Sequence, residues 1–180
     1  MEEKKYDFIF KIILIGESQV GKTNIVSRFL RNNFDENSRS TIGVEFGTKI
    51  FNIDGHQIKA QFWDTSGLER YKTINFAYYK GVKGAFVVYD ITNKESFDKV
   101  DNMMNDLKKL AQTDVSIILI GNKNDLEDKR EIMKEQGEEK AKKHNAYFIE
   151  TSALTGENLD KAFEMMMTEL YQKEKNSNEK

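Results

Sequence analysis

The chain has 180 residues, a length that suits one well-buried domain better than two. Its 28 Lys and Arg residues nearly balance its 30 Asp and Glu residues, so no field of one sign favours nucleic acid or an anionic membrane as a partner. It has no cysteine, which excludes disulfides, thiolate metal sites, a cysteine nucleophile and a cysteine-linked lipid, and no apolar run nears the roughly 18 residues that span a bilayer.

The first predicted elements are a strand and a helix joined by a glycine-containing loop. Residues 8–15 form an apolar run typical of a strand buried on both faces, and residues 22–31 carry apolar positions at helical spacing. Between them, G-E-S-Q-V-G-K-T at 16–23 fits the phosphate-binding pattern G-x-x-x-x-G-K-S/T in the context it requires. Backbone N–H groups would bind phosphate oxygens there, Lys22 would reach the β- and γ-phosphates, and Thr23 would ligate Mg2+. Taken alone, the motif has an alternative interpretation as a glycine turn ahead of a helix.

An antiparallel hairpin is predicted next. Residues 42–53 and 57–64 both have strand composition, and the Asp-Gly pair between them is a hairpin-turn signal. The sequence D-T-S-G closes the second strand. Its Asp64 can hold Mg2+ directly or through water, and its Gly67 N–H can approach the γ-phosphate because no side chain intrudes.

The second half of the chain alternates strands and helices. Apolar runs predict buried strands at 84–89 and 115–120. Apolar residues at three- and four-residue spacing predict helices at 94–111, 131–143 and 157–172. We interpret the three consecutive methionines of the last helix as core and surface filler, and the polar residues 172–180 as a frayed tail.

A base-reading motif follows the strand at 115–120. In N-K-N-D, the carboxylate of Asp125 can accept two hydrogen bonds, which matches the paired N1 and N2 donors of guanine, and adenine lacks this pair. The stem of Lys123 would cover the base face, and Asn122 would tie this loop to the phosphate loop. An N-K-x-D sequence is more often a polar turn, but its position after a buried strand favours the base reader.

A fourth polar cluster, E-T-S-A-L at 150–154, ends a last short strand, where a backbone N–H near Ala153 would meet guanine O6. This signal is weak by itself. All four clusters follow the carboxyl ends of apolar strands, and open α/β sheets bind their ligands at that edge. The sequence therefore predicts an α/β fold with one nucleotide site.

In this order, the four clusters resemble the signature set of Ras-like small GTPases. Intervening segments are similar to those that mark Rab proteins: I-G-V-E-F at 42–46, K-A-Q-F-W-D at 59–64, E-R-Y at 69–71, Y-Y-K-G at 78–81 and V-Y-D-I-T at 88–92. S-T-I-G-V-E-F with I-K-A-Q is most similar to the Rab eleven branch. The resemblance implies a P-loop G domain with a mixed, mostly parallel six-stranded sheet, one antiparallel strand and helices on both faces.

The resemblance also implies the ligands, which are GTP or GDP with Mg2+. Thr41 would complete Mg2+ coordination beside Thr23 and Asp64, and Phe34, which by itself reads as a loop anchor, would pack against the guanine. Lys22, Thr41, Gly67 and position 68 would act in GTP hydrolysis. The implied nucleotide-binding residues are Ser18, Gln19, Val20, Gly21, Lys22, Thr23, Asn24, Phe34, Ser40, Thr41, Gly67, Asn122, Lys123, Asp125, Ser152, Ala153 and Leu154.

Partner binding is predicted at an aromatic patch. Period two in the strand 57–64 places Trp63 on its polar side, where a large ring needs an explanation. A covered edge residue is one explanation. The resemblance implies instead that Phe46, Trp63 and Tyr78 bind effectors, and that the switches around 32–45 and 65–80 respond to the γ-phosphate.

Three positions depart from the family pattern. Gln19 adds bulk where most Rabs have a small residue, Ser66 replaces the usual alanine, and Leu68 replaces the glutamine that orients the attacking water. Leu68 leaves two hypotheses open: a slow Mg2+-dependent GTP hydrolase that acts as a timer, and a nucleotide-loaded platform that hardly turns over. A P-loop kinase is a third, but the chain has no evident lid or acceptor site.

The expected organisation is an N-terminal extension at 1–7, the G domain at 8–172 and the start of a flexible tail at 173–180. Rabs usually end in a prenylated cysteine pair, so we expect a longer natural tail whose lipid attaches a cytoplasmic protein to the cytosolic face of endomembranes, with an unlipidated protein as the alternative. We expect a monomer whose protein partners are effectors, exchange factors and GTPase-activating proteins, and no nucleic acid.

Overall fold

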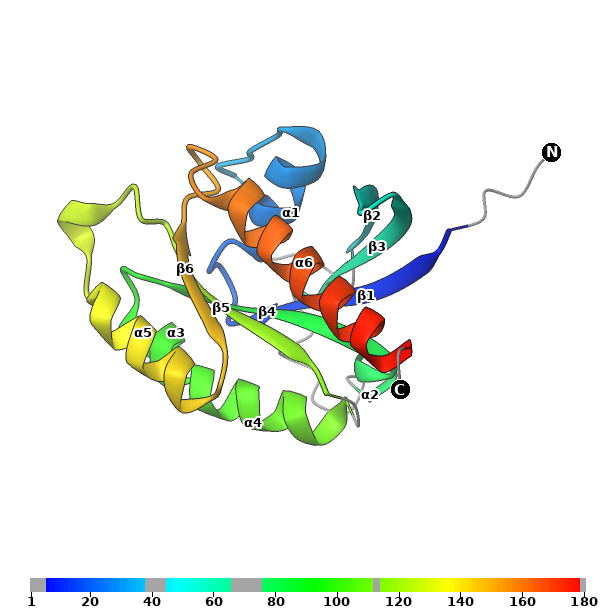
Figure 1. The fold of residues 1–180 in the computed structure, drawn as a ribbon. Coiled ribbons are helices and arrows are strands. Elements are labelled where there is room, and N and C mark those ends of the chain that lie inside the picture. Colours follow the sequence, from blue (N-terminus) through cyan, green and yellow to red (C-terminus); the bar gives the residue numbers. More distant parts are fainter. Residues whose placement is uncertain (1–5, 38–44, 66–75, 112–113, 179–180) are drawn as a thin grey trace.

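The computed structural model describes residues 6–37, 45–65, 76–111 and 114–178. In these ranges the chain forms a six-stranded sheet with helices on both faces (Figure 1). The strands are β1 (Phe8–Gly16), β2 (Glu45–Ile53), β3 (His56–Asp64), β4 (Val82–Asp90), β5 (Ser116–Asn122) and β6 (Tyr147–Thr151). The helices are α1 (Lys22–Arg31), α2 (Phe76–Tyr79), α3 (Lys94–Asp98), α4 (Val100–Leu110), α5 (Lys134–Lys143) and α6 (Leu159–Asn178), with a 3-10 turn at Glu127–Lys129.

The sheet is mixed, with the strand order β2-β3-β1-β4-β5-β6. Among the described strands, β2 alone runs antiparallel to its neighbour, and the pairs from β3 to β6 are parallel. Asp54 and Gly55 have φ values of 51° and 80°, and a two-residue hairpin of type I′ requires positive φ at both positions. The predicted α/β architecture and its antiparallel hairpin are confirmed.

Two apolar layers hold the sheet between the helices. Ile12 and Leu14 of β1 pack in the cluster that includes α1 and α6, while Ile13 and Ile15 pack in the cluster that includes α3, α4 and α5. Since both faces are covered, β1 needs apolar residues at consecutive positions. Met166 and Met167 are buried in the α6 layer, in accord with their interpretation as core.

The predicted helix at 94–111 is two helices in the structure. Asn93 caps α3, because its side chain accepts a hydrogen bond from the Ser96 N–H at 3.0 Å, and α3 ends at Asp98. Helix α4 then begins at Val100. Apolar spacing continued across the junction and gave no sign of the break. Helix α5 begins at Lys134, three residues later than its pattern indicated.

The predicted frayed tail is wrong for residues 173–178, because α6 continues to Asn178. Lys173 lies 3.0 Å from Asp114 and 3.8 Å from Glu169, and Glu174 lies 3.6 Å from Lys83. Lys and Glu have high helix propensity, and such pairs support the polar last turns of the helix. These turns have no apolar face, so the apolar spacing did not indicate them. Within the described ranges, no helix has both the length and the apolar character needed to cross a bilayer.

Candidate functional site

The carboxyl ends of β1, β3, β4, β5 and β6 meet at one edge of the sheet, because these strands are parallel. At this edge the glycine-containing loop between β1 and α1 lies under Lys22. The Lys22 Nζ donates to the carbonyls of Gly16 and Glu17, each at 2.7 Å, and the side chain is buried. The ammonium group is thus held over its own loop, as a phosphate-binding lysine must be.

Two residues of this loop adopt left-handed backbone conformations. Gly21 has φ of 103°, and a Cβ there would lie 2.3 Å from Asn122 Nδ2, so the site accepts only glycine. Gln19 has φ of 66°, a region that costs a non-glycine residue about 1 kcal/mol. Its side chain is exposed, so the bulk that the sequence indicated points outward.

Asn122 joins three of the predicted loops. Its Nδ2 donates to the Val20 carbonyl at 2.9 Å, which confirms the expected tie between the two motifs. Its Oδ1 accepts from the Thr151 hydroxyl at 3.0 Å and from the Ala153 N–H at 3.3 Å. The N–H that we expected to meet guanine O6 therefore donates to Asn122 in this structure.

Lys123 and Asp125 extend from the loop after β5. The Lys123 Nζ donates to the Gln19 carbonyl at 2.9 Å and pairs with Asp90 at 2.7 Å, so its stem crosses the space between the phosphate loop and β4. One oxygen of Asp125 accepts from the Ser152 hydroxyl at 2.6 Å. The carboxylate is exposed, and this hydrogen bond orients it for planar donors such as those of guanine.

Thr23 and Asp64, two of the three predicted metal ligands, lie in contact. The Thr23 hydroxyl donates to an Asp64 oxygen at 2.5 Å, and Asp64 is fully buried. One carboxylate, one hydroxyl and phosphate oxygens are a donor set that Mg2+ accepts, so the residues present fit this ion.

Phe34 is held in place by the hydrophobic core. Its ring packs against the core cluster under α1, and the Asn24 amide holds the adjoining loop by donating to the Asp35 carbonyl at 3.0 Å and accepting from the Asp35 N–H at 3.1 Å. The described contacts of Asn24 thus position the loop. The interpretation of Phe34 as a loop anchor agrees with this packing.

Phe46, Trp63 and Tyr78 come together as predicted. The ring centroids of Phe46 and Trp63 lie 5.2 Å apart, and those of Trp63 and Tyr78 lie 6.0 Å apart. Phe46 is 52% exposed, whereas Trp63 is half-buried, and the Lys11 Nζ lies 4.5 Å from the centroid of its ring. The solvent-facing side that period two predicted for Trp63 is thus partly covered.

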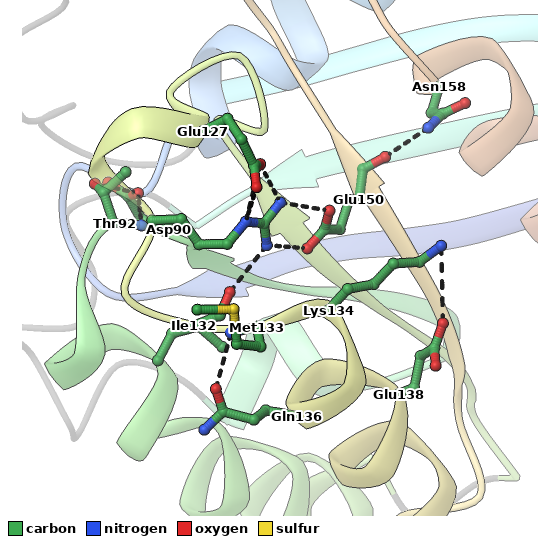
Figure 2. A network of polar contacts seen from close by, with 11 residues as sticks. Asp90, Thr92, Glu127, Ile132, Met133, Lys134, Gln136, Glu138, Glu150 and Asn158 are labelled. Atoms are coloured by element: carbon green, nitrogen blue, oxygen red, sulfur yellow. Dashed lines mark hydrogen bonds and ion pairs between the residues drawn. The ribbon is translucent and has the colours of Figure 1, made fainter.

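The motifs did not reveal a cluster of charges behind the base-reading loop. Arg130 pairs with Glu127 and with Glu150, which lies on β6. Figure 2 labels the two glutamates. The hydrogen bonds that Arg130 donates to Glu150, and then those to Glu127, raise the pKa of Arg130, so it stays charged. In addition, Lys99 lies 3.0 Å from Glu17 of the phosphate loop, and the hydrogen bonds that it donates to Glu95 and Glu17 raise the pKa of Lys99.

Four predicted site residues, Ser40, Thr41, Gly67 and Leu68, lie outside the residues that the structure describes. Leu154 is described and 43% exposed, at the rim beside Ala153. The described part of the site therefore contains the phosphate loop, two of the three predicted metal ligands and the base-reading loops.

Comparison with known proteins identifies the family. The sequence pattern of the Ras family matches residues 11–172. The Ras-related protein Rab2BV of Beta vulgaris is 48% identical over 169 residues, which cover 94% of this chain and 79% of the relative. Ras-related RABA2c of Arabidopsis thaliana and Rab11C of Lotus japonicus are 48% and 47% identical, each over 94% of this chain and 78% of the relative. The chain belongs to the Ras family of small GTPases and, within it, to the Rab proteins of the Rab eleven branch.

Proposed function

We propose that this chain is a guanine-nucleotide switch that recruits effectors in its GTP state and thereby regulates vesicle traffic. Ras-like GTPases generally bind guanine nucleotide and Mg2+. The observation that carries the proposal for this chain is the position of Asn122, which joins the phosphate loop to the two loops that would surround a base. A site built this way binds phosphate and base as one unit.

In this proposal the residues of the site divide among the phosphates, the base and the metal ion. Lys22 and the loop N–H groups bind the β- and γ-phosphates, and Asp125 accepts from guanine N1 and N2. Thr23 and Asp64, with Thr41, hold Mg2+, which supplies charge compensation for the phosphates. Lys123 covers the base and is itself oriented by Asp90.

We further propose that GTP hydrolysis is strongly attenuated. Phosphoryl transfer to water is accelerated by holding the nucleophile in line, and the isobutyl group of Leu68 can neither donate nor accept a hydrogen bond. The chain would then be an effector-binding platform that hydrolyses little GTP. The alternative is a slow hydrolase that acts as a timer, with Lys22, Thr41 and Gly67 providing the remaining catalysis.

The partners follow from the same proposal. Effectors bind the patch of Phe46, Trp63 and Tyr78, while exchange factors and GTPase-activating proteins act on the nucleotide site. The chain acts as a monomer at the cytosolic face of endomembranes.

Nucleotide binding tests the proposal. The nucleotide that co-purifies is identified, and the dissociation constants for GTP, GDP and ATP are measured for the parent and for Asp125→Ala. We expect GTP or GDP in the purified protein, no measurable affinity for ATP, and a loss of about 1–3 kcal/mol or more in guanine nucleotide affinity for the variant. An Asp125→Ala protein that binds GTP as tightly as the parent and still rejects ATP would show that another group reads the base.

A further inference from the structure

Arg130 makes more hydrogen bonds than any other charged side chain near the base-reading loop. Its Nε and Nη2 donate to Glu127, and its Nη1 donates to the Ile132 carbonyl at 2.9 Å. Its Nη1 and Nη2 also donate to the two oxygens of Glu150, at 2.6 Å and 2.9 Å. The guanidinium thus has carboxylate or carbonyl acceptors on all three of its nitrogens.

The two carboxylates around Arg130 differ in exposure. The Glu150 side chain is 10% exposed, as is that of Arg130, whereas the Glu127 side chain is 70% exposed. An exposed ion pair contributes little, while a two-bond pair between a guanidinium and a carboxylate removed from water fixes geometry. The pair of Arg130 and Glu150 therefore fixes the positions of the two segments that carry these residues. Glu127 is a solvent-exposed partner that contributes less.

This constraint lies directly behind the residues that would read guanine. Arg130 ends the short turn that follows Asp125, and Glu150 precedes Thr151 and Ser152 on β6. Figure 2 shows Glu150 between this turn and Asn158, whose Nδ2 donates to the Glu150 carbonyl at 2.9 Å. The Arg130 side chain thus joins the loop of Asp125 to β6, directly before Ser152.

The two joined segments meet again inside the site. The Ser152 hydroxyl donates to Asp125 at 2.6 Å, and the Asn124 N–H donates to the Thr151 carbonyl at 3.1 Å. A change in the spacing of the segments would rotate the Asp125 carboxylate away from one of the two guanine donors. Hypoxanthine keeps the N1–H donor but lacks the exocyclic N2 amino group, so a comparison of the two bases measures the contact of Asp125 with N2.

We propose that Arg130 is a positioning residue for base recognition, which acts through Glu150 to fix the Asp125 carboxylate and so sets the preference for guanine over hypoxanthine. This inference rests on the proposed guanine nucleotide site. Arg130 itself does not contact the nucleotide in this proposal. Loss of the Arg130–Glu150 pair therefore changes the discrimination between bases more than it changes the binding of the ribose and phosphates, which both nucleotides share.

The test compares GDP with inosine diphosphate, which differs from GDP only by the missing amino group. Dissociation constants for both are measured for the parent, for Arg130→Met with Glu150→Leu, and for Glu127→Gln. The double variant replaces the buried pair with apolar groups of similar size, which avoids leaving one charge unpaired. We expect the preference for GDP to fall at least about fivefold in the double variant, as loss of one well-oriented hydrogen bond implies. We expect Glu127→Gln to keep the preference.

Arg130→Lys provides a rescue with the same charge. Lysine can pair with Glu150 as a point charge but cannot form the two-bond contact, so we expect a preference between those of the parent and the double variant. An unchanged preference in the double variant, even with a lowered melting temperature, would overturn the inference and leave Arg130 a purely structural residue. A parent that binds neither diphosphate would overturn the proposed function as well, so the two failures are distinguishable.

Discussion

The side-chain amide of Asn122 donates to the main-chain carbonyl of Val20 at 2.9 Å, across 102 positions of the chain. This single bond couples the phosphate loop to β5. With the two bonds that Asn122 accepts from Thr151 and Ala153, it makes the conformation of each loop depend on the others.

Asn122→Ala is expected to weaken both the fold and nucleotide binding. The change leaves a buried carbonyl, hydroxyl and N–H without their partner, which we expect to cost about 2–4 kcal/mol in the free energy of unfolding without nucleotide. Urea unfolding and GDP affinity measure the two effects. The matched control is Asn124→Ala, because the Asn124 Oδ1 has no hydrogen-bond donor among the described residues. Equal effects of the two variants would contradict the coupling role of Asn122.

The loops that carry this site were predictable because each is a local pattern after an apolar strand. The motif at 16–23 and Asp125 are read within a few residues, and the structure brings them to one edge of the sheet. The mixed sheet followed from the Asp-Gly turn and from the apolar runs. Chain-local signals were sufficient for these loops and for the hairpin.

Other structural features could not be predicted from local sequence patterns, mostly because they depend on residues far away in the chain. Arg130 is one of many charged residues in a polar loop, and its meaning depends on Glu150, which lies 20 positions later. The last turns of α6 pair with Asp114, which precedes β5, and with Lys83 of β4. The break between α3 and α4 at Lys99 is a different case, because the apolar spacing continues across it and gives no sign of it.

Trp63→Ala is expected to abolish effector binding to the GTP-loaded chain. The indole joins Phe46 and Tyr78 in one patch, and an aromatic anchor at an interface is commonly worth about 2–4 kcal/mol. Affinity for an effector fragment that binds the GTP form of a Rab eleven relative is measured by calorimetry. The control is Tyr147→Ala, an exposed aromatic at the opposite edge of the sheet. Undiminished binding by the Trp63 variant would remove the patch from the effector site.

Gly137→Ala is expected to destabilise the fold, although alanine favours a helix over glycine by about 1 kcal/mol. A Cβ at this position of α5 would lie 2.4 Å from the Phe148 ring and 2.6 Å from the Tyr89 hydroxyl. Overpacking of rigid rings costs about 1–3 kcal/mol, so the net effect is a loss. Urea unfolding compares this variant with Glu138→Ala on the same helix. An increase in stability would show that the rings move aside freely.

Asp101→Asn is expected to lower stability at neutral pH and to have less effect in acid. Hydrogen bonds from His144, Lys140 and Lys143 hold the pKa of Asp101 well below its ordinary value. Asp101 therefore contributes to the free energy of unfolding at pH values above about 4, the pKa of an Asp in the unfolded chain. This contribution is lost progressively as the pH falls from there through the lower pKa of the folded state. We expect a loss of about 1–2 kcal/mol at pH 7. Urea unfolding at several pH values measures this, with the exposed Asp98→Asn as control. A pH-independent difference would contradict the charge-based origin.

Leu68→Gln is expected to raise GTP turnover, with the larger increase in the presence of a GTPase-activating protein. An activating protein supplies charge to the phosphate oxygens, and that charge has little effect unless a water is held in line. A glutamine amide can orient this water through hydrogen bonds, whereas leucine cannot. Nucleotide affinity should change little, because the loop bonds of Lys22 and the base contacts of Asp125 do not involve position 68.

The measurement is single-turnover GTP hydrolysis by the parent and by Leu68→Gln, each with and without an activating protein competent for Rab eleven relatives. Met133→Gln, which changes an exposed apolar residue at the start of α5, controls for a general effect of an added amide. In the related GTPase Ras, an activating protein accelerates hydrolysis by about 10⁵-fold. Because positioning of the water supplies much of this acceleration, we expect most of the response only in Leu68→Gln. If the parent responds to the activating protein as strongly as the variant, the block lies elsewhere, and the chain acts as a timer rather than a locked platform.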